Sequence, residues 1–246
     1  MQKEWSLPIG FKDVQGTVHR KVVVSEITGY DEEFLLNGAK KGQTVDVLIG
    51  FLLRLVKKIG TLEKIDESVI KKLLVGDLNY LLVAVRCESL GKELEFEIQC
   101  PKCKNQEQFS QDLTELSVIE LGDEDPREFT VELEKGYVDE TGKAHKTAKV
   151  QFLSVADQEK MGSALEDPAR VMNMLLVKSI VQLGGLPAVS LQIVKSLTKK
   201  DRDKIFAEIR NRTPGINLNA DIECSSCGYK SKVPIGLESF FGFRAV

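Results

Sequence analysis

The sequence predicts an α+β protein made of two copies of one unit, each a β-hairpin followed by helices and by a strand that ends in a Cys-x-x-Cys turn. Three observations predict it. The chain resembles itself at a constant offset, glycine-rich turns and extended runs precede helical stripes in both halves, and four of the five cysteines form two Cys-x-x-Cys pairs. We expect the units to span residues 1–126 and 127–246 and to be related by a pseudo-twofold axis, like a fused dimer.

The internal repeat is clearest around the cysteines, because Cys224 and Cys227 follow Cys100 and Cys103 by 124 residues. The same offset aligns other residues without a gap: Val47 with Val171, Leu52 with Leu176, Gly60 with Gly184, Asp77 with Asp201, Arg86 with Arg210 and Gly91 with Gly215. Near the N-terminus the offset is 126, and it matches Gly10, Asp13, Gly16 and His19 to Gly136, Asp139, Gly142 and His145. A colinear set of this length indicates a tandem duplication.

Each predicted unit begins with a hairpin. The turn at Gly10–Gly16 lies between two extended runs, and Gly136–Gly142 repeats it in the second unit. A helix is expected next over Val45–Lys58, where apolar residues recur at helical spacing.

Short polar side chains mark the expected starts of later helices. Asp66 and its counterpart Ser190 are predicted N-caps of one short helix in each unit. Asp77 and Asp201 are predicted to open the helix that follows.

The last helix of each unit differs between the halves. Leu78–Arg86 is apolar on almost every side and is expected to be central, whereas its copy Arg202–Arg210 is more polar. The two halves should therefore have different functions.

After the first of these helices, Leu94–Ile98 alternates apolar and charged residues, which predicts a strand leading into the cysteines. The acidic stretch Gly122–Pro126 is the expected linker between the units.

Composition excludes several classes of function. The formal net charge is −3, from 34 basic and 37 acidic residues, so no overall basic field would attract nucleic acid or an anionic membrane. No run of 18 apolar residues appears, and the N-terminal segment lacks the layout of a signal peptide. We therefore expect a soluble, intracellular protein, in which paired cysteines favour a metal over disulfides.

The cysteine pairs predict one structural zinc site. A Cys-x-x-Cys turn directs two sulfurs at one point, and tetrahedral Zn²⁺ is commonly held by four thiolates. Each half supplies two, so Cys100, Cys103, Cys224 and Cys227 are expected to converge if the units pack about a twofold axis. Four thiolates leave no open position for water, so no catalysis by the metal is expected.

Other uses of these residue types are weaker explanations. A redox dithiol at Cys100 and Cys103 lacks the supporting βαβ pattern, and Cys87 is expected to be a small buried apolar residue. His19 and His145 could be imagined as ligands or a base, but a histidine that hydrogen-bonds its own hairpin turn is the simpler interpretation. No catalytic triad, phosphate-binding glycine loop or HExxH helix is present, so no catalytic residue and no enzymatic activity are predicted.

Four short motifs follow one another along the chain: Leu7-Pro8-x-Gly10-x-x-Asp13-x-x-Gly16-x-x-His19-Arg20, Thr28-Gly29-x-Asp31-Glu32-Glu33, Leu74-Val75-Gly76-Asp77-x-x-x-Leu81-Leu82 and Cys100-Pro-x-Cys103. Taken in this order, they resemble the T-even phage baseplate family of hub and assembly proteins in contractile tails and related injection machines. The resemblance is clearest over residues 1–115.

The resemblance implies an assembly protein that binds other tail or baseplate proteins, joins a symmetric ring or hub, and has no catalytic residues. It implies a location in the host cytoplasm during assembly, and leaves open whether the protein stays in the virion baseplate or only assists its assembly. The alternative function is a zinc-ribbon nucleic-acid-binding protein, because Lys102, Lys104, Lys230 and Lys232 flank the cysteines.

Overall fold

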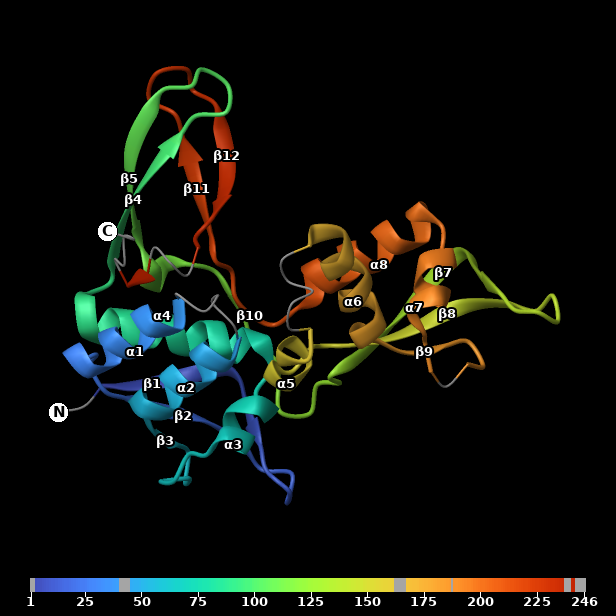
Figure 1. Cartoon of the computed structure of the whole chain (residues 1–246), viewed down its shortest axis with the longest axis horizontal. Helices are drawn as coiled ribbons and strands as arrows, with labels where there is room; N and C mark the ends of the chain where they lie inside the picture. Colours follow the sequence, from blue (N-terminus) through green and yellow to red (C-terminus); the bar gives the residue numbers. More distant parts are fainter. Residues whose placement is uncertain (1–2, 40–44, 162–166, 187, 237–239, 242–246) are drawn as a thin grey trace.

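The computed structural model describes residues 3–39, 45–161, 167–186, 188–236 and 240–241, and within these ranges the protein is mixed α+β. The described residues form eight α-helices and several small antiparallel sheets. Three groups of elements stand apart in Figure 1, and we call them the first lobe, the second lobe and the cysteine lobe.

The first lobe is a three-stranded sheet covered by helices. Strands β1 (Glu4–Lys12), β2 (Val18–Val24) and β3 (Val56–Ile59) are antiparallel in that order. The helices of this lobe are α1 (Gly29–Ala39), α2 (Val45–Leu55), α3 (Glu67–Lys72) and α4 (Val75–Leu90).

The second lobe repeats this sheet. Strands β7 (Glu128–Val138), β8 (Ala144–Gln151) and β9 (Ile180–Leu183) are again antiparallel in that order. Its helices are α6 (Pro168–Ser179), α7 (Leu191–Ser196) and α8 (Lys199–Arg212), and the short helix α5 (Val155–Glu159) lies at the joint between the two lobes.

The cysteine lobe consists of two hairpins from opposite halves of the chain. One is formed by β4 (Glu93–Gln99) and β5 (Gln106–Asp112), and the other by β11 (Asn219–Glu223) and β12 (Lys230–Pro234). The hairpins stand side by side and project from the helices of the first lobe (Figure 1). A 3₁₀ turn at Leu113–Glu115 follows the first hairpin, and the short strands β6 (Val118–Ile119) and β10 (Gly215–Ile216) pair where the chain returns from α8.

The predicted helix over Val45–Lys58 was too long at its C-terminal end. Helix α2 ends at Leu55, and the chain continues directly as the edge strand β3, whose Val56 and Lys58 pair with β2. The β-branched Val56 and Ile59 are both buried, so pairing and burial favour an extended backbone over another helical turn. In the second lobe α6 passes into β9 in the same way.

Asp66 and Ser190 cap α3 and α7 as predicted, since each side chain accepts a hydrogen bond from a backbone N–H in the first helical turn. The prediction for Asp77 and Asp201 was wrong. Both lie inside the first turn, after the N-caps Leu74 and Thr198, and their carboxylates instead bind a neighbouring strand.

Two hydrophobic cores hold the fold together, and their boundary does not follow the order of the chain. The larger core fills the first lobe and includes residues from far along the sequence, such as Ile216, Ile222, Phe240 and Phe241. The smaller core is confined to residues 131–205 of the second lobe. The described part of the chain after α8 therefore packs against the first lobe.

The return of the chain to the first lobe explains why α4 is buried on almost every side and α8 is not. Helix α4 is the centre of the larger core, with Leu78, Leu81, Leu82 and Val85 nearly inaccessible, and the bases of both hairpins belong to the same core. Its counterpart α8 has no such cover among the described elements, and of its non-polar residues only Ile205 is fully buried. The more polar character predicted for Arg202–Arg210 therefore agrees with the solvent exposure of much of α8.

Candidate metal centre

The four predicted cysteines meet at the far end of the cysteine lobe. Cys100 and Cys224 follow strands β4 and β11 directly, and Cys103 and Cys227 lie in the turns that connect each hairpin. Their four Sγ atoms lie within 4.8 Å of one another. The Sγ atoms of Cys100 and Cys227 are 3.8 Å apart, and those of Cys103 and Cys224 are 3.6 Å apart.

These distances fit a tetrahedral thiolate site. A Zn–S bond of about 2.3 Å requires sulfurs roughly 3.8 Å apart along each edge of the tetrahedron. Four cysteines are a ligand set typical of structural Zn²⁺, so the group could hold a metal such as zinc.

Both turns are built by the same backbone bonds. In the first, the N–H of Lys104 donates to the carbonyl of Cys100 at 2.9 Å, and in the second the N–H of Gly228 donates to the carbonyl of Cys224 at 2.8 Å. Lys104 and Gly228 have the left-handed φ values of 64° and 66°. The turns therefore present their sulfurs in the same way, although only one carries the glycine that this conformation favours.

The folded turns alter the acidity of the buried thiols. Backbone N–H groups of Cys103 and Lys102 donate to the sulfur of Cys100 and lower the pKa of this thiol to about 6. Burial raises the pKa of Cys224 to about 12. A divalent cation at this position would favour the thiolate form of every ligand.

Apolar side chains support the cysteines from below. Ile98 and Phe109 of the first hairpin and Ile222 and Tyr229 of the second line the space beneath the sulfurs. The hairpins are also joined by a polar contact, because the N–H of Ser225 donates to the Glu107 carboxylate at 3.1 Å. Cys87 lies in α4 outside this group, half-buried, and burial raises the pKa of its thiol.

Each histidine binds its own hairpin turn, as the simpler interpretation of the sequence predicted. The His19 Nε2 lies 3.0 Å from Asp13 Oδ2, and the His145 Nε2 lies 2.9 Å from Asp139 Oδ2. Hydrogen bonds from His19 lower the pKa of Asp13, and bonds from Thr141 and His145 lower that of Asp139. Both histidines are buried, and each contact with an aspartate fixes the hairpin turn. Neither histidine belongs to the cysteine group.

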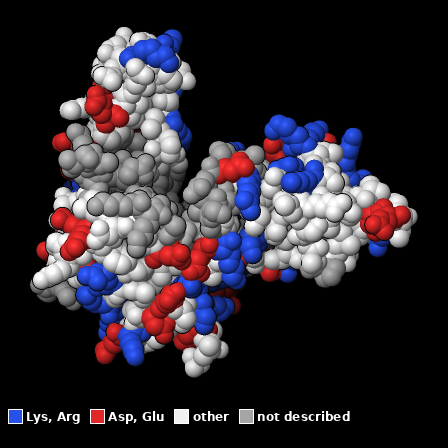
Figure 2. Space-filling model, viewed as in Figure 1, with Lys and Arg blue, Asp and Glu red and all other residues white. Residues whose placement is uncertain are grey.

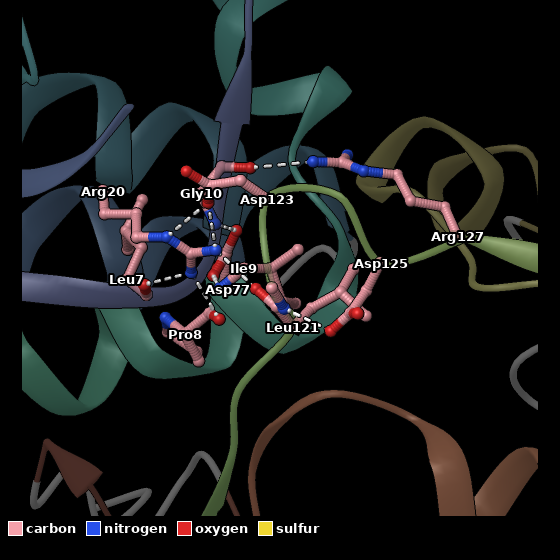
Figure 3. Close-up of polar contacts among 11 residues, drawn as sticks. Leu7, Pro8, Ile9, Gly10, Arg20, Asp77, Leu121, Asp123, Asp125 and Arg127 are labelled. Carbon is pink, nitrogen blue, oxygen red and sulfur yellow. Dashed lines mark hydrogen bonds and ion pairs between the residues drawn. The ribbon is translucent and has the colours of Figure 1, made fainter. Parts of the chain in front are cut away.

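A polar network that the sequence analysis missed attaches the first hairpin to α4 (Figure 3). The fully buried Asp77 accepts hydrogen bonds from the N–H groups of Ile9 and Gly10, at 3.0 and 2.9 Å. In the second lobe, Asp201 accepts from the N–H groups of Glu134 and Gly136 at 2.6 and 3.0 Å. The signal in the sequence was the joint repetition of the aspartates and the glycines, which the N-cap interpretation did not use.

The acidic linker at residues 122–126 is held beside the same hairpin, next to strand β1. The Arg20 guanidinium donates to the carbonyls of Pro8 and Leu121 and to the Asp123 carboxylate, the last at 2.7 Å from Nη2 (Figure 3). The N–H of Leu121 in turn donates to the Pro8 carbonyl at 3.0 Å. The segment between the lobes is therefore anchored on β1.

Charges of both signs cover the molecule. Figure 2 shows lysine and arginine side chains at the tip of the cysteine lobe and over the helices of the second lobe, with acidic groups beside them. Of the four lysines near the cysteines, Lys230 pairs with Glu223 at 3.1 Å and Lys232 with Asp221 at 3.5 Å. No described helix has the length and apolar character needed to cross a membrane.

Comparison with known protein families decides the affiliation, because the sequence model of the T4 bacteriophage base plate protein family matches residues 7–242. The chain belongs to this family. It is a structural family of the phage baseplate and not an enzyme family, which implies tail proteins as partners. No match was found among curated proteins or among solved structures. The resemblance seen in the N-terminal half thus extends over nearly the whole of this baseplate protein.

Proposed function

We propose that this baseplate protein is a non-catalytic assembly component of the hub region, which binds other baseplate or tail proteins, and that a structural Zn²⁺ on Cys100, Cys103, Cys224 and Cys227 joins its two halves. The observation that carries the metal is the convergence of cysteines from the two halves of the chain, whose Sγ atoms lie within 4.8 Å of one another. The observation that carries the assembly role is the family match over residues 7–242.

The arrangement of the sulfurs supports a pseudo-twofold relation between the two Cys-x-x-Cys turns. The first cysteine of each turn contacts the second cysteine of the other, because the Sγ atoms of Cys100 and Cys227 lie 3.8 Å apart and those of Cys103 and Cys224 lie 3.6 Å apart. A twofold axis requires this reciprocity, since residue i must contact j where j contacts i.

We further propose that the chain arose by duplication of one unit, represented by residues 1–126 and 127–246. Matching features of the two lobes support this: the strand orders β1-β2-β3 and β7-β8-β9, the His–Asp pairs in both hairpin turns, and the aspartates Asp77 and Asp201 bound to the same bend of each hairpin. The register of each hairpin also shifts at this bend.

The two units then differ in what covers them. The hairpin of β11 and β12, which carries Cys224 and Cys227, packs onto the first lobe. The second lobe, including α8, is left as a separate projecting body (Figure 1). Such a protein can hold two different neighbours at once or match a subunit ring to one of half its symmetry. We therefore propose an adaptor that assembles in the host cytoplasm and enters a symmetric ring or hub.

The experiment is to co-express the tagged protein with the surrounding tail genes, isolate it, and measure bound zinc and co-purifying proteins. Wild type should carry one zinc per chain and recover tail proteins. Cys224→Ser/Cys227→Ser should lose the zinc and the partners that depend on the cysteine lobe. Cys87→Ser is the matched control and should keep both.

Three outcomes would count against parts of the proposal. Zinc-free wild type that is stably folded would overturn the metal site, and unchanged partners in the double variant would show that the zinc junction is dispensable for assembly. A wild type that recovers no tail protein, but binds DNA with strong salt dependence, would favour the nucleic-acid alternative.

A further inference from the structure

The outward face of α8 is exposed and carries an excess of positive charge. Four exposed basic side chains lie on it: Lys199, Lys200, Lys204 and Arg210. At 3.6 residues per turn they fall within an arc of roughly 140°, so they share one side of the helix. Figure 2 shows lysine and arginine groups over the helices of this lobe. Residues 168–212, which contain α6, α7 and α8, have nine basic and three acidic residues, a net charge of +6 in a chain whose total is −3.

Two of these four positive charges lack an ionic partner. Lys199 and Lys200 pair with acidic groups beside them, at 2.8 and 2.7 Å. No acidic side chain among the described residues pairs with Lys204 or Arg210. A solvated surface normally intersperses charges of both signs, whereas an excess of one sign attracts a partner of the other.

The matching face of the first lobe is an interface within the chain. The repeat offset of 124 aligns these four positions with Val75, Gly76, Tyr80 and Arg86 of α4, all of which are buried or half-buried. The returning chain crosses here, so that a Cβ on Gly76 would lie 2.1 Å from the carbonyl oxygen of Pro214. Arg86 donates to the carbonyls of Gly91 and Glu93 below the first hairpin, at 2.7 and 2.9 Å. In the second lobe no described element covers the equivalent face, and lysine and arginine occupy it.

The same chain carries an acidic face elsewhere. Glu93, Glu95 and Glu97 alternate with less exposed residues along β4, and we call these three the acidic stripe. Ser110 and Gln108, which lie opposite Glu95 and Glu97 on β5, are uncharged. No basic side chain among the described residues forms an ion pair with the stripe. Residues 1–126 as a whole have 22 acidic and 16 basic residues, a net charge of −6.

The two faces have matching lengths. An antiparallel strand rises about 3.4 Å per residue, so the acidic stripe is roughly 14 Å long. A helix rises about 1.5 Å per residue, so Lys200 and Arg210 are roughly 15 Å apart along α8. One molecule cannot join its own two faces, because the hairpin of β11 and β12 stands between the hairpin of β4 and β5 and the second lobe (Figure 1). The complementary faces can meet only between copies.

We propose that the basic face of α8 in one copy binds the acidic stripe of a second copy, head to tail. The contact is heterologous, since it joins two different surfaces, and repetition of such a contact generates a ring where the rotation closes. This inference rests on the proposed function, because it names how identical chains of an assembly protein would enter a ring. Its test needs no other tail protein, so its failure can be told from a failure of the co-expression experiment.

The test is sedimentation velocity of the purified full-length protein over a range of concentrations. Wild type should associate at low salt and dissociate in about 1 M salt, where the Debye length falls to about 3 Å and exposed charges are screened. Lys204→Gln/Arg210→Gln and Glu95→Gln/Glu97→Gln should each weaken self-association by roughly tenfold or more. Both variants should keep the thermal unfolding midpoint of the wild type, because none of the four side chains forms a described ion pair.

Mixing the two variants gives the sharpest result. Each retains one intact face, so an equal mixture should form a dimer and no larger species. A chain with the charges exchanged, Lys204→Glu/Arg210→Glu/Glu95→Lys/Glu97→Lys, should associate again. The matched control is Lys57→Gln/Lys58→Gln, which removes two exposed positive charges from β3 and should associate like the wild type.

Wild type that stays monomeric at low salt, or that associates equally well in about 1 M salt, would overturn the proposal. Association lost in the α8 variant but kept in the β4 variant would assign the basic face to another acidic surface and overturn the stripe. Monomeric wild type that binds duplex DNA through Lys204 and Arg210 would assign the face to nucleic acid instead.

Discussion

At the scale of single residues, Asp77 and Asp201 occupy matching positions but differ in their hydrogen bonds. Asp77 receives two backbone N–H donors, and burial raises the pKa of its carboxyl to about 6 although Arg127 and Arg20 lie nearby. Asp201 is also desolvated, but three backbone N–H groups and the hydroxyl of Thr198 bind it and leave its pKa lowered. Leu74 stands where the second lobe has Thr198, so Asp77 lacks the hydroxyl donor.

This difference predicts opposite pH dependences for Asp77→Asn and Asp201→Asn. Between pH 4 and 7 the folded protein retains the proton of Asp77 more readily than the unfolded chain does. The stabilisation of wild type over Asp77→Asn should therefore fall with rising pH, by up to about 3 kcal/mol. The stabilisation of wild type over Asp201→Asn should be fully present at pH 7, above the unfolded pKa, and shrink as the pH falls towards the lowered folded pKa.

Urea unfolding of the three proteins at pH 3, 4, 5, 6 and 7 measures both slopes, because the effect of Asp201 is lost mainly below its unfolded pKa of 3.8. The two variants act as controls for each other, because each removes one carboxylate from the same kind of hairpin bend. Slopes of the same sign would contradict the assignment of a raised pKa to Asp77 alone.

At the scale of elements, the chain returns from α8 to the cysteine lobe through a crossing that only glycine permits. A Cβ on Gly76 in the first turn of α4 would lie 2.1 Å from the carbonyl oxygen of Pro214, and one on Gly215 would lie 2.5 Å from the Cα of Gly76. The counterpart of Gly76 in α8 is the exposed Lys200, where no chain crosses. The crossing places β10 beside β6 and brings the second hairpin next to the first.

Gly76→Ala should therefore destabilise the protein although alanine is the better helix former. The gain in helix propensity is about 1 kcal/mol, but backbone atoms must move to admit the methyl group, and we expect a net loss of about 1–3 kcal/mol. Chemical denaturation measures it. Gly29→Ala, at the first residue of α1 with no atom near the added Cβ, is the control and should change stability little. Equal effects at the two sites would refute the crossing as the cause.

At the scale of the whole molecule, the proposed metal would stabilise the cysteine lobe more than the second lobe. In the first hairpin, exposed residues alternate with buried or half-buried ones along β4 and β5, and the stacked Phe96 and Phe109 both belong to this hairpin. The two hairpins share the apolar space below the sulfurs, which Ile98, Phe109, Ile222 and Tyr229 line. The second lobe has its own core around Leu176 and Ile205. Zinc binding free energy would appear mainly as stability of the cysteine lobe.

Removal of the metal with excess chelator should therefore act locally. Amide hydrogen exchange in β4, β5, β11 and β12 should accelerate by roughly 100-fold or more, while protection in β7, β8 and β9 is retained. Added zinc should restore the slow exchange, which controls for damage by the chelator. Uniform loss of protection over both lobes, or none in the hairpins, would contradict a local structural role.

Local patterns in the sequence were sufficient for much of this protein. The hairpin turns, the N-caps Asp66 and Ser190, the strand before Cys100 and the convergence of two Cys-x-x-Cys turns depend on a few neighbouring residues or on the repeat itself. The extent of α2 could not be predicted in this way, because Val56 suits helix and strand alike until β2 lies beside it.

Only the tertiary structure decided which lobe each part of the chain joins. The two lobes become unequal in space, because Gly76 and Gly215 let the chain cross and place the second Cys-x-x-Cys hairpin over α4. That path covers α4, leaves most of α8 in solvent and leaves a cavity that Leu175 lines. These features depend on contacts between residues more than 60 positions apart, which periodicity and spacing do not encode.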